Sequence, residues 1–226
     1  MLYDFKIRFE IAHIKLISKS LDILKSISKG ELTRIESLFI ENKKTYLENK
    51  IDLPEIFDSR MIKLHHFLAD MQVKHYNNKL LNVLQLGDFG FLLVDVKQKF
   101  IDTGIIMKNK RINNINVKLS ENELRIINIA CTLYWKILVG DFSYIISFKK
   151  YNTLDDFETD LFAAGLLARN LVESNYYFSI EDKFINRKAK WAYDICKCID
   201  SIDSIDNDDI IKNIGTLPRL KIIKNG

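Results

Sequence analysis

Two ionisable residues, Asp95 and Lys97, follow an apolar run in the segment FLLVDVKQKF (residues 91–100). If this segment is a strand, its period of two places both side chains on one face. A carboxylate there could bind Mg²⁺, and a lysine two positions along could orient the attacking water. Asp88 lies upstream and could supply a second carboxylate. The spacing therefore makes Asp88, Asp95 and Lys97 the candidate catalytic set, with the two aspartates as metal ligands.

The elements expected around this set suggest a family. We expect residues 54–148 to run helix, three or four strands, helix and strand. This order loosely resembles the core of the PD-(D/E)xK nucleases, in which an acidic residue and a D/E-x-K pair hold a divalent metal. The resemblance implies a Mg²⁺-dependent nuclease. An acidic residue two positions before a lysine is also common at strand ends, and we favour an ordinary strand that runs into solvent.

A second set of candidate residues is basic and polar. We expect TGIIMKNKRINNINVKL (residues 103–119) to form an exposed hairpin with a basic tip, similar to the wing of a winged-helix domain. Cations and amides at such a tip are groups that contact nucleic-acid phosphates or an acidic protein surface. The candidate contact residues are Lys108, Lys110, Arg111, Asn113, Asn114 and Lys118.

Histidine chemistry is a third hypothesis. Arg8–His13 and Arg60–His65 both have the R-x4-H spacing of HEPN ribonucleases, and LLARNLVESNYYF (166–178) is similar to a helix of that class. Asn175, however, stands where that class needs a histidine. Two unrelated copies of so short a motif indicate a chance match.

Charge is segregated along the chain. The 226 residues include 34 basic and 30 acidic ones, and the formal charge of +4 is too small to indicate nucleic acid by itself. A basic stretch at 97–118 contrasts with an acidic stretch at 200–209, which suits protein docking as well as phosphate binding. The aromatic residues at 176–178 cannot all face one side of a helix, and aromatics are favoured at interfaces. The candidate protein-contact residues are Tyr176, Tyr177, Asp206, Asp208 and Asp209.

The composition is that of an ordinary globular protein, with 47% hydrophobic and 28% charged residues. The three cysteines are an odd, unpatterned set, which indicates reduced, buried thiols rather than a zinc site or a disulfide framework. No apolar run reaches the roughly 18–20 residues that a membrane span needs. The N-terminus carries charges too early for a signal peptide. We therefore expect a cytoplasmic protein.

The small numbers of glycines and prolines, 8 and 2, indicate a helical chain. Capping boxes are expected at Ser28–Glu31 and Ser120–Glu123, the second opening a helix that ends at Gly140. The expected elements are helices over 4–28, from about 31 and from 54 to about 76, hairpins over 79–100 and 103–119, a helix over 121–138, a strand over 142–148, and helices after 153–156 and 179–182.

The predicted fold is α+β and mainly α-helical. Residues 1–77 should form a helical bundle, 78–150 a small, mostly antiparallel sheet with the basic hairpin and one helix, and 151–226 C-terminal helices and a charged tail, all within one compact unit. No catalytic constellation is complete, so we predict a non-catalytic accessory subunit that docks on a larger intracellular protein, with DNA contact through the basic hairpin. Heavy use of Ile, Lys and Asn suggests a bacterial defence or mobile-element system. No cofactor is expected, and the Mg²⁺-dependent nuclease is the alternative.

Overall fold

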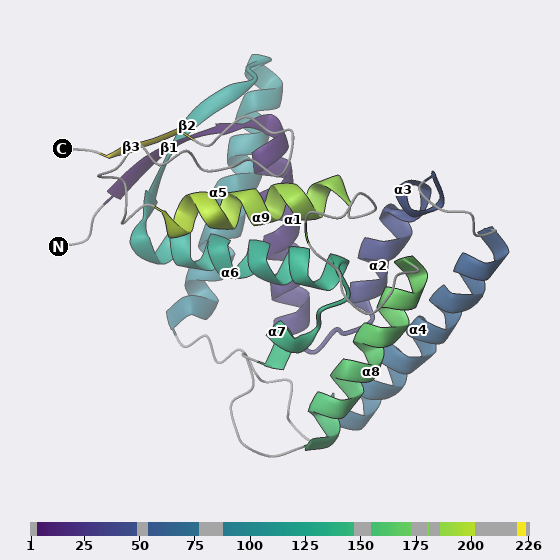
Figure 1. Ribbon diagram of the computed structural model, residues 1–226. Helices are drawn as coiled ribbons and strands as arrows, with labels where there is room; N and C mark the ends of the chain where they lie inside the picture. Colours follow the sequence, from purple (N-terminus) through teal and green to yellow (C-terminus); the bar gives the residue numbers. More distant parts are fainter. Residues whose placement is uncertain are drawn as a thin grey trace.

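The computed structural model describes residues 4–48, 54–76, 88–146, 155–172, 180, 186–201 and 221–224. This part of the chain is mainly helical with a small antiparallel sheet, which confirms the expected fold class (Figure 1). The elements are β1 (Asp4–Glu10), α1 (Ile11–Ser28), α2 (Arg34–Glu41), α3 (Lys43–Glu48), α4 (Pro54–Tyr76), α5 (Asp88–Lys110), β2 (Asn114–Ser120), α6 (Glu121–Leu138), α7 (Ser143–Ile146), α8 (Asp155–Val172), α9 (Arg187–Asp200) and β3 (Lys221–Lys224).

The sheet has the strand order β2-β1-β3, and both neighbours run antiparallel to β1. Ile7 of β1 lies opposite Val117 of β2 on one side and Ile222 of β3 on the other. Ile7 and Phe9 are buried while Arg8 between them is exposed, as the period of two requires. The prediction of a sheet within 78–150 is therefore wrong, because two of its three strands come from the two ends of the chain.

Residues 4–10 were expected to begin a helix and instead form β1. Their apolar residues fit both periods: Phe5 and Phe9 are four apart, and Phe5, Ile7 and Phe9 alternate with polar residues. Residues 4–10 form a strand rather than a helix because they pair with β2 and β3. Helix α1 follows without a loop, and the N–H of Glu10 donates to Nδ1 of buried His13 at 3.0 Å.

Helix α1 ends just before Gly30, which lies inside the capping box expected at 28–31. Gly30 has a φ of +83°, and its N–H donates to the carbonyl of Ile27 at 2.9 Å. The N–H of Glu31 reaches back to the carbonyl of Ser26 at 3.0 Å, which is the pattern of a glycine-terminated helix. The expected capping box at 28–31 is therefore a helix end, and α2 begins only at Arg34.

The largest correction concerns residues 88–118. The segment expected to form one hairpin and the start of another is the single helix α5, which includes Gly90, followed by a turn and β2. Its buried residues have helical spacing: Leu93, Val96, Phe100 and Met107. The pattern was obscured because Phe91 and Val94 are apolar but exposed. The strand expected at 142–148 is likewise replaced, over its described part, by the short helix α7.

Helix α6 matches its prediction. The N–H of Glu123 donates to Oγ of Ser120 at 3.3 Å, and the N–H of Ser120 donates to Oε2 of Glu123 at 2.7 Å, which completes the capping box. The helix ends before Gly140, whose φ is +71°. The other long helices expected, α4 and α8, are also present, and α9 begins at Arg187 with Asn186 as its N-cap. The three cysteines are free and buried, as predicted.

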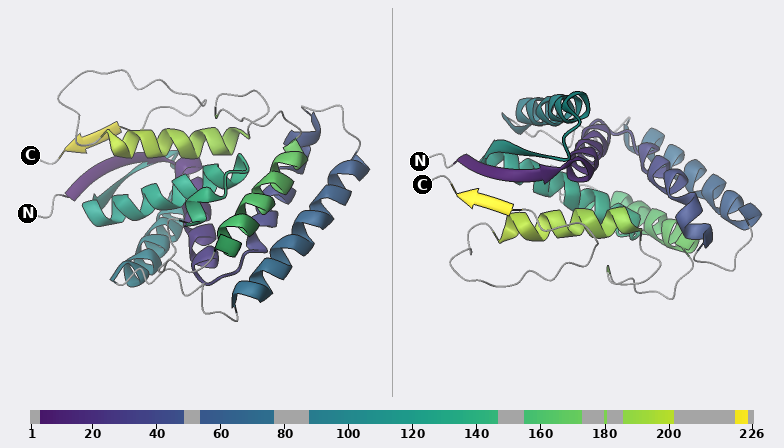
Figure 2. Two further views of the ribbon diagram at one scale, coloured as in Figure 1. Left: turned by 60° about the horizontal axis from the view of Figure 1, so that its bottom comes forward. Right: turned by 90° about the horizontal axis from the view of Figure 1, so that it is seen from above.

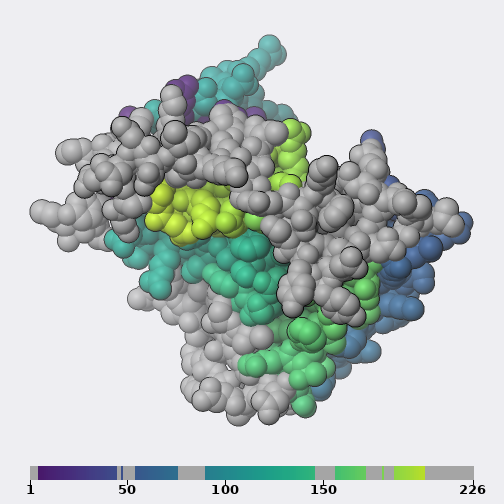
Figure 3. Space-filling view, in the orientation of Figure 1, coloured from purple at the N-terminus to yellow at the C-terminus, as the bar shows by residue number. Residues whose placement is uncertain are grey.

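The elements form one hydrophobic cluster with α1 inside it, in contact with β1, α2, α5, α6 and α9. The inner face of the sheet meets α5 through the edge-to-face rings of Phe9 and Phe100, whose centroids are 5.4 Å apart. Figure 2 shows α4 and α8 packed side by side at the far end from the sheet. On the face in Figure 3, the surfaces of α9, α6 and α8 follow one another in a band. None of the described helices is long and apolar enough to cross a membrane.

Two glycines let α8 approach the end of α6, and they give a stability test. A Cβ on Gly165 would lie 2.8 Å from the carbonyl oxygen of Gly140, which is backbone and cannot rotate away. We expect Gly165→Ala to lower the free energy of unfolding by about 1–3 kcal/mol. Gly104→Ala is the matched control, because its Cβ would meet only Cγ2 of Ile14 at 3.5 Å. The control should gain about 0.5–1 kcal/mol in urea unfolding, since alanine favours a helix interior. Equal midpoints for the two variants would contradict the close approach.

The cap at His13 makes stability depend on pH. Burial lowers the pKa of His13 from 6.5 to about 4, so the folded chain holds the imidazole neutral and able to accept the N–H of Glu10. Because the unfolded chain takes up this proton at a higher pH, stability should fall as the pH drops from 6.5 to 4, by about 3 kcal/mol in total. His13→Gln keeps an acceptor at the same helix position but does not titrate. Its unfolding free energy, measured in urea across this range, should fall less steeply, and an identical slope would exclude His13 as the cause.

Candidate functional site

The predicted catalytic set does not come together on one strand face, because all three residues lie on α5. Asp95 and Lys97 are two positions apart, so their side chains leave the helix about 200° apart. Asp95 is exposed, and Nζ of Lys97 turns to α1 and pairs with Asp22. Asp88, the first residue of α5, lies about 10 Å along the axis from Asp95, which is too far for one metal to bridge. No group of three His, Cys, Asp or Glu residues in the described ranges could hold a metal ion.

The two R-x4-H pairs are engaged in separate structural contacts. Nη1 of Arg60 donates to the carbonyl of Asn170 at 2.8 Å, joining α4 to α8. Nδ1 of His65 lies 2.5 Å from Oε2 of Glu36 on α2. Arg8 lies in β1, where its Nη2 donates to Oδ1 of Asn114 at 2.8 Å, and His13 caps α1. The structure therefore does not bring the two pairs into one site.

The predicted basic residues are all exposed, but they lie on a helix, a turn and a strand rather than on a hairpin. Lys108 and Lys110 belong to the last turn of α5, and Arg111 and Asn113 to the turn that follows. Asn114 and Lys118 lie in β2. Three of the six, Lys108, Arg111 and Asn113, line a common groove. The candidate protein contacts Tyr176, Tyr177, Asp206, Asp208 and Asp209 lie outside the described residues.

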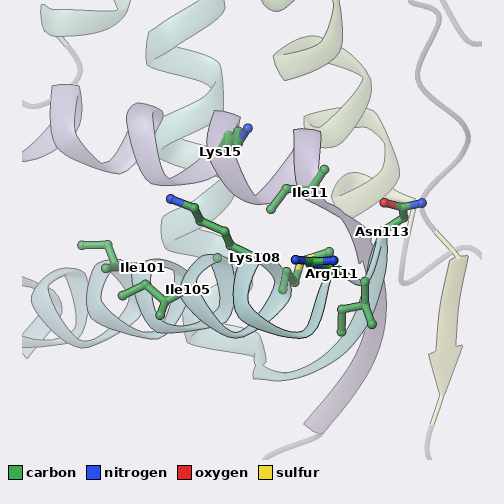
Figure 4. Close-up of a pocket in the computed structure, with 10 residues that line it drawn as sticks. Ile11, Lys15, Ile101, Ile105, Lys108, Arg111 and Asn113 are labelled. Atoms are coloured by element: carbon green, nitrogen blue, oxygen red, sulfur yellow. The ribbon is translucent and has the colours of Figure 1, made fainter.

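This groove lies between α1 and α5 and has a volume of about 560 Å³ (Figure 4). Its walls are mostly apolar: Ile11, Ile101, Ile105, Met107 and Ile112. Among the described residues, its charged members are all cations, Lys15 from α1, Lys108 from α5 and Arg111 from the turn. The groove residues on α1 were not predicted, because nothing in residues 11–15 themselves indicates which helix packs against them.

A second hollow of about 420 Å³ continues the groove, sharing Lys15, Ile101 and Gly104 with it. It reaches along α1 to Asp22 and across to α2. Burial of Lys19, together with repulsion from neighbouring cations, lowers the pKa of its ammonium group to about 8, even though this group pairs with Glu41. The α2 end of the groove is thus occupied by internal ion pairs.

The cations at the other end have no such partners. Neither Lys15, Lys108 nor Arg111 makes a side-chain ion pair or hydrogen bond within the ranges that the structure describes. Lysine or arginine in the last turn of a helix can be explained by the helix dipole, which accounts for Lys108. It does not account for Lys15, which lies in the second turn of α1.

Arg111 is held in a backbone conformation that normally favours glycine. Its φ is +52°, its N–H donates to the carbonyl of Lys108 at 3.3 Å, and the N–H of Ile112 donates to that of Met107 at 3.1 Å. These bonds end α5 in the same way as Gly30 ends α1. The turn is fixed to α1 because the carbonyl of Asn113 accepts the N–H of Ile11 at 3.1 Å. Figure 4 shows the Arg111 guanidinium beside the groove.

A row of exposed apolar residues borders the groove on α5. Phe91, Val94, Ile101 and Ile105 are 81%, 48%, 36% and 52% exposed, and Gln98 completes their alternating spacing of three and four. This spacing places the row on a single face of the helix, roughly opposite the buried residues. A helical period applied to residues 91–105 separates the buried row from the exposed one. A strand's period of two does not separate them.

No protein-family model matches the chain, and comparison with curated proteins and with solved structures finds no significant match. The groove and the adjoining row on α5 are therefore interpreted from their own geometry.

The backbone at Arg111 predicts a measurable cost. A non-glycine residue in the left-handed region costs about 1–2 kcal/mol, part of which glycine recovers. We therefore expect Arg111→Gly to raise the free energy of unfolding by about 1 kcal/mol. Lys108→Gly, one turn earlier inside the helix, is the control and should lower it by about 1 kcal/mol. Thermal and urea unfolding of both variants check this, and a less stable Arg111→Gly variant would show that the arginine is retained for the fold.

Proposed function

We propose that this chain is a non-catalytic interaction subunit that docks on a larger protein of a cytoplasmic complex through the groove and the exposed row of α5. The observation that carries the proposal is the continuity of the two. Exposed apolar side chains at helical spacing run into an apolar groove, and the cations at its edge have no ion pair among the described residues. A bacterial defence or mobile-element complex is the setting that the composition suggests.

Ile101, Ile105 and Ile112 form one apolar surface, because all three line the same groove. Single exposed apolar residues are normal on a folded protein, whereas a joined patch indicates a surface that another molecule covers. Complete burial of an isoleucine-sized side chain contributes about 1.5–3 kcal/mol. Ile101, Ile105 and Ile112 are 36%, 52% and 37% exposed, so covering all three removes from water little more than one side chain's worth of surface and would supply about 2–4 kcal/mol.

A protein explains the groove better than a nucleic acid does. Phosphates would satisfy Lys15, Lys108 and Arg111, but they would leave the apolar walls facing a charged backbone. DNA contact is the second candidate function, and the outer face of the sheet favours it. There Lys6 of β1 lies directly opposite Lys118 of β2, which places two cations side by side on the face turned away from the core.

The proposal predicts a partner at fixed stoichiometry. Affinity purification from the native cell at low salt, with mass spectrometry and sizing, should recover the chain with a larger protein. Ile105→Glu should abolish this association, because it places a carboxylate among the apolar side chains of the row. Lys108→Glu should also weaken the association, and this effect should become smaller as the salt concentration rises. Val73→Glu, at a 65%-exposed position on α4, is the matched control and should retain the partner.

Two results would contradict this function. One is a wild-type chain that elutes alone as a monomer. The other is a partner that Ile105→Glu and Val73→Glu retain equally, since the partner would then contact another face. If DNA co-elutes and Lys6→Glu releases it while Ile105→Glu does not, the sheet face is the functional one.

A further inference from the structure

We infer that the groove between α1 and α5 receives an amphipathic helix of the partner protein, with an acidic flank at the end where Lys15, Lys108 and Arg111 lie. The inference rests on the proposed function and specifies which kind of partner segment binds in the groove. The shape of the groove, the spacing of its apolar side chains and its charges all favour such an occupant.

The groove has the dimensions of a short helix. The groove and the hollow that continues it are lined on α1 by Ile11, Ile14, Lys15, Ser18, Lys19, Asp22 and Ile23. Among these, Ile11, Lys15, Ser18 and Asp22 recur at intervals of four, three and four and so share one face. This face extends for about 16 Å, or three helical turns. Helix α5 lies along its other side through residues 101–108, so that two helices form the walls of one trough (Figure 4). A third helix laid in such a trough is a common mode of peptide recognition.

The apolar row on α5 indicates the secondary structure of the occupant. Its members alternate at three and four positions, which is the spacing of residues in the seam between packed helices. An extended peptide has a period of two and would meet only some of them. Gly104 leaves the floor open where the occupant would approach most closely, because it presents no side chain to the groove.

The charges indicate which helix fits. At the α2 end, Asp22 already pairs with Lys97, and Lys19 with Glu41. At the opposite end the cations Lys15, Lys108 and Arg111 line the groove with no carboxylate beside them in the part of the chain that the structure describes. Arg111 is kept there in a conformation that glycine would adopt more easily. Acidic side chains on the partner helix would pair with these cations.

A second copy of α5 is a poorer occupant. One flank of the row carries Asp95 and Asp102, and an antiparallel pair of α5 helices would bring this flank against its own copy. Like charges would then meet along the seam.

The test is a peptide selection on the intact chain. A display library of random peptides, long enough for four helical turns, is selected on the wild-type protein and counter-selected on Gly104→Met, which fills the groove without changing its charge. The expected peptides have apolar residues at i, i+3, i+4 and i+7 and a cluster of Asp or Glu. Enriched peptides without this pattern, or none that distinguish the two proteins, would overturn the inference.

Affinities of one enriched peptide, measured by fluorescence anisotropy, then locate the contact. Gly104→Met and Lys15→Glu should each raise Kd at least about tenfold. Arg111→Gly should also raise it while the protein becomes more stable, which unfolding cannot explain. Val73→Glu, on α4 and away from the groove, is the control that should change Kd less than about twofold. A duplex DNA oligonucleotide that competes as well as the peptide would show a general polyanion site and overturn the inference.

The peptide selection and the affinity purification test different claims, so one can fail while the other succeeds. If the native partner is recovered and is lost in Ile105→Glu, but no acidic amphipathic peptide is selected, the partner helix is wrong and the docking function stands. If the chain alone forms a dimer that Ile105→Glu dissociates, a second copy fills the groove and the inference is wrong. If the wild-type chain is a monomer in the native cell, the docking function itself is wrong.

Discussion

The burial of α1 is the constraint on which the rest of the structure depends. Its buried positions lie around much of its circumference, and β1, α2, α5, α6 and α9 all contact it. One face is not covered, the one that carries Ile11, Lys15, Ser18 and Asp22, because α5 lies beside that face rather than over it. The groove exists for this reason. Helix α1 is thus packed against other elements on several sides and open on one.

Both ends of α1 are fixed by local backbone chemistry that suits its central position. At the start, buried His13 accepts the N–H of Glu10, and the carbonyl of Asn113 accepts that of Ile11. At the other end, the left-handed conformation of Gly30 stops the helix. The turn that supplies Asn113 also supplies Arg111, so one backbone hydrogen bond joins the start of α1 to the cationic end of the groove. The position of the Arg111 backbone therefore depends on the packing of α1.

Sequence reasoning found the elements whose signals are local. Helix α6 was predicted from Ser120, Glu123 and Gly140, and α4 from Pro54 and the spacing after it, because caps and turn residues act on their own neighbours. Strand β1 could not be found this way, since its partners are more than 100 residues away. Helix α5 was misread because it is apolar on two faces. Part of the site was predicted, namely Lys108, Arg111 and Asn113. Lys15 was not, because the fold alone brings α1 against that segment.

The order of strands has a consequence for how the chain is made. Strand β1 leaves the ribosome before both of its partners, since β2 is some 100 residues behind it and β3 about 100 more. During synthesis the edge of β1 that β3 will cover has unpaired amides and carbonyls, which favour pairing with other nascent chains. Closing so long a loop is slow because most of its entropy is lost before the contact forms. The charged residues Lys6 and Arg8, which alternate with the apolar ones, oppose association of the unpaired strand with other chains.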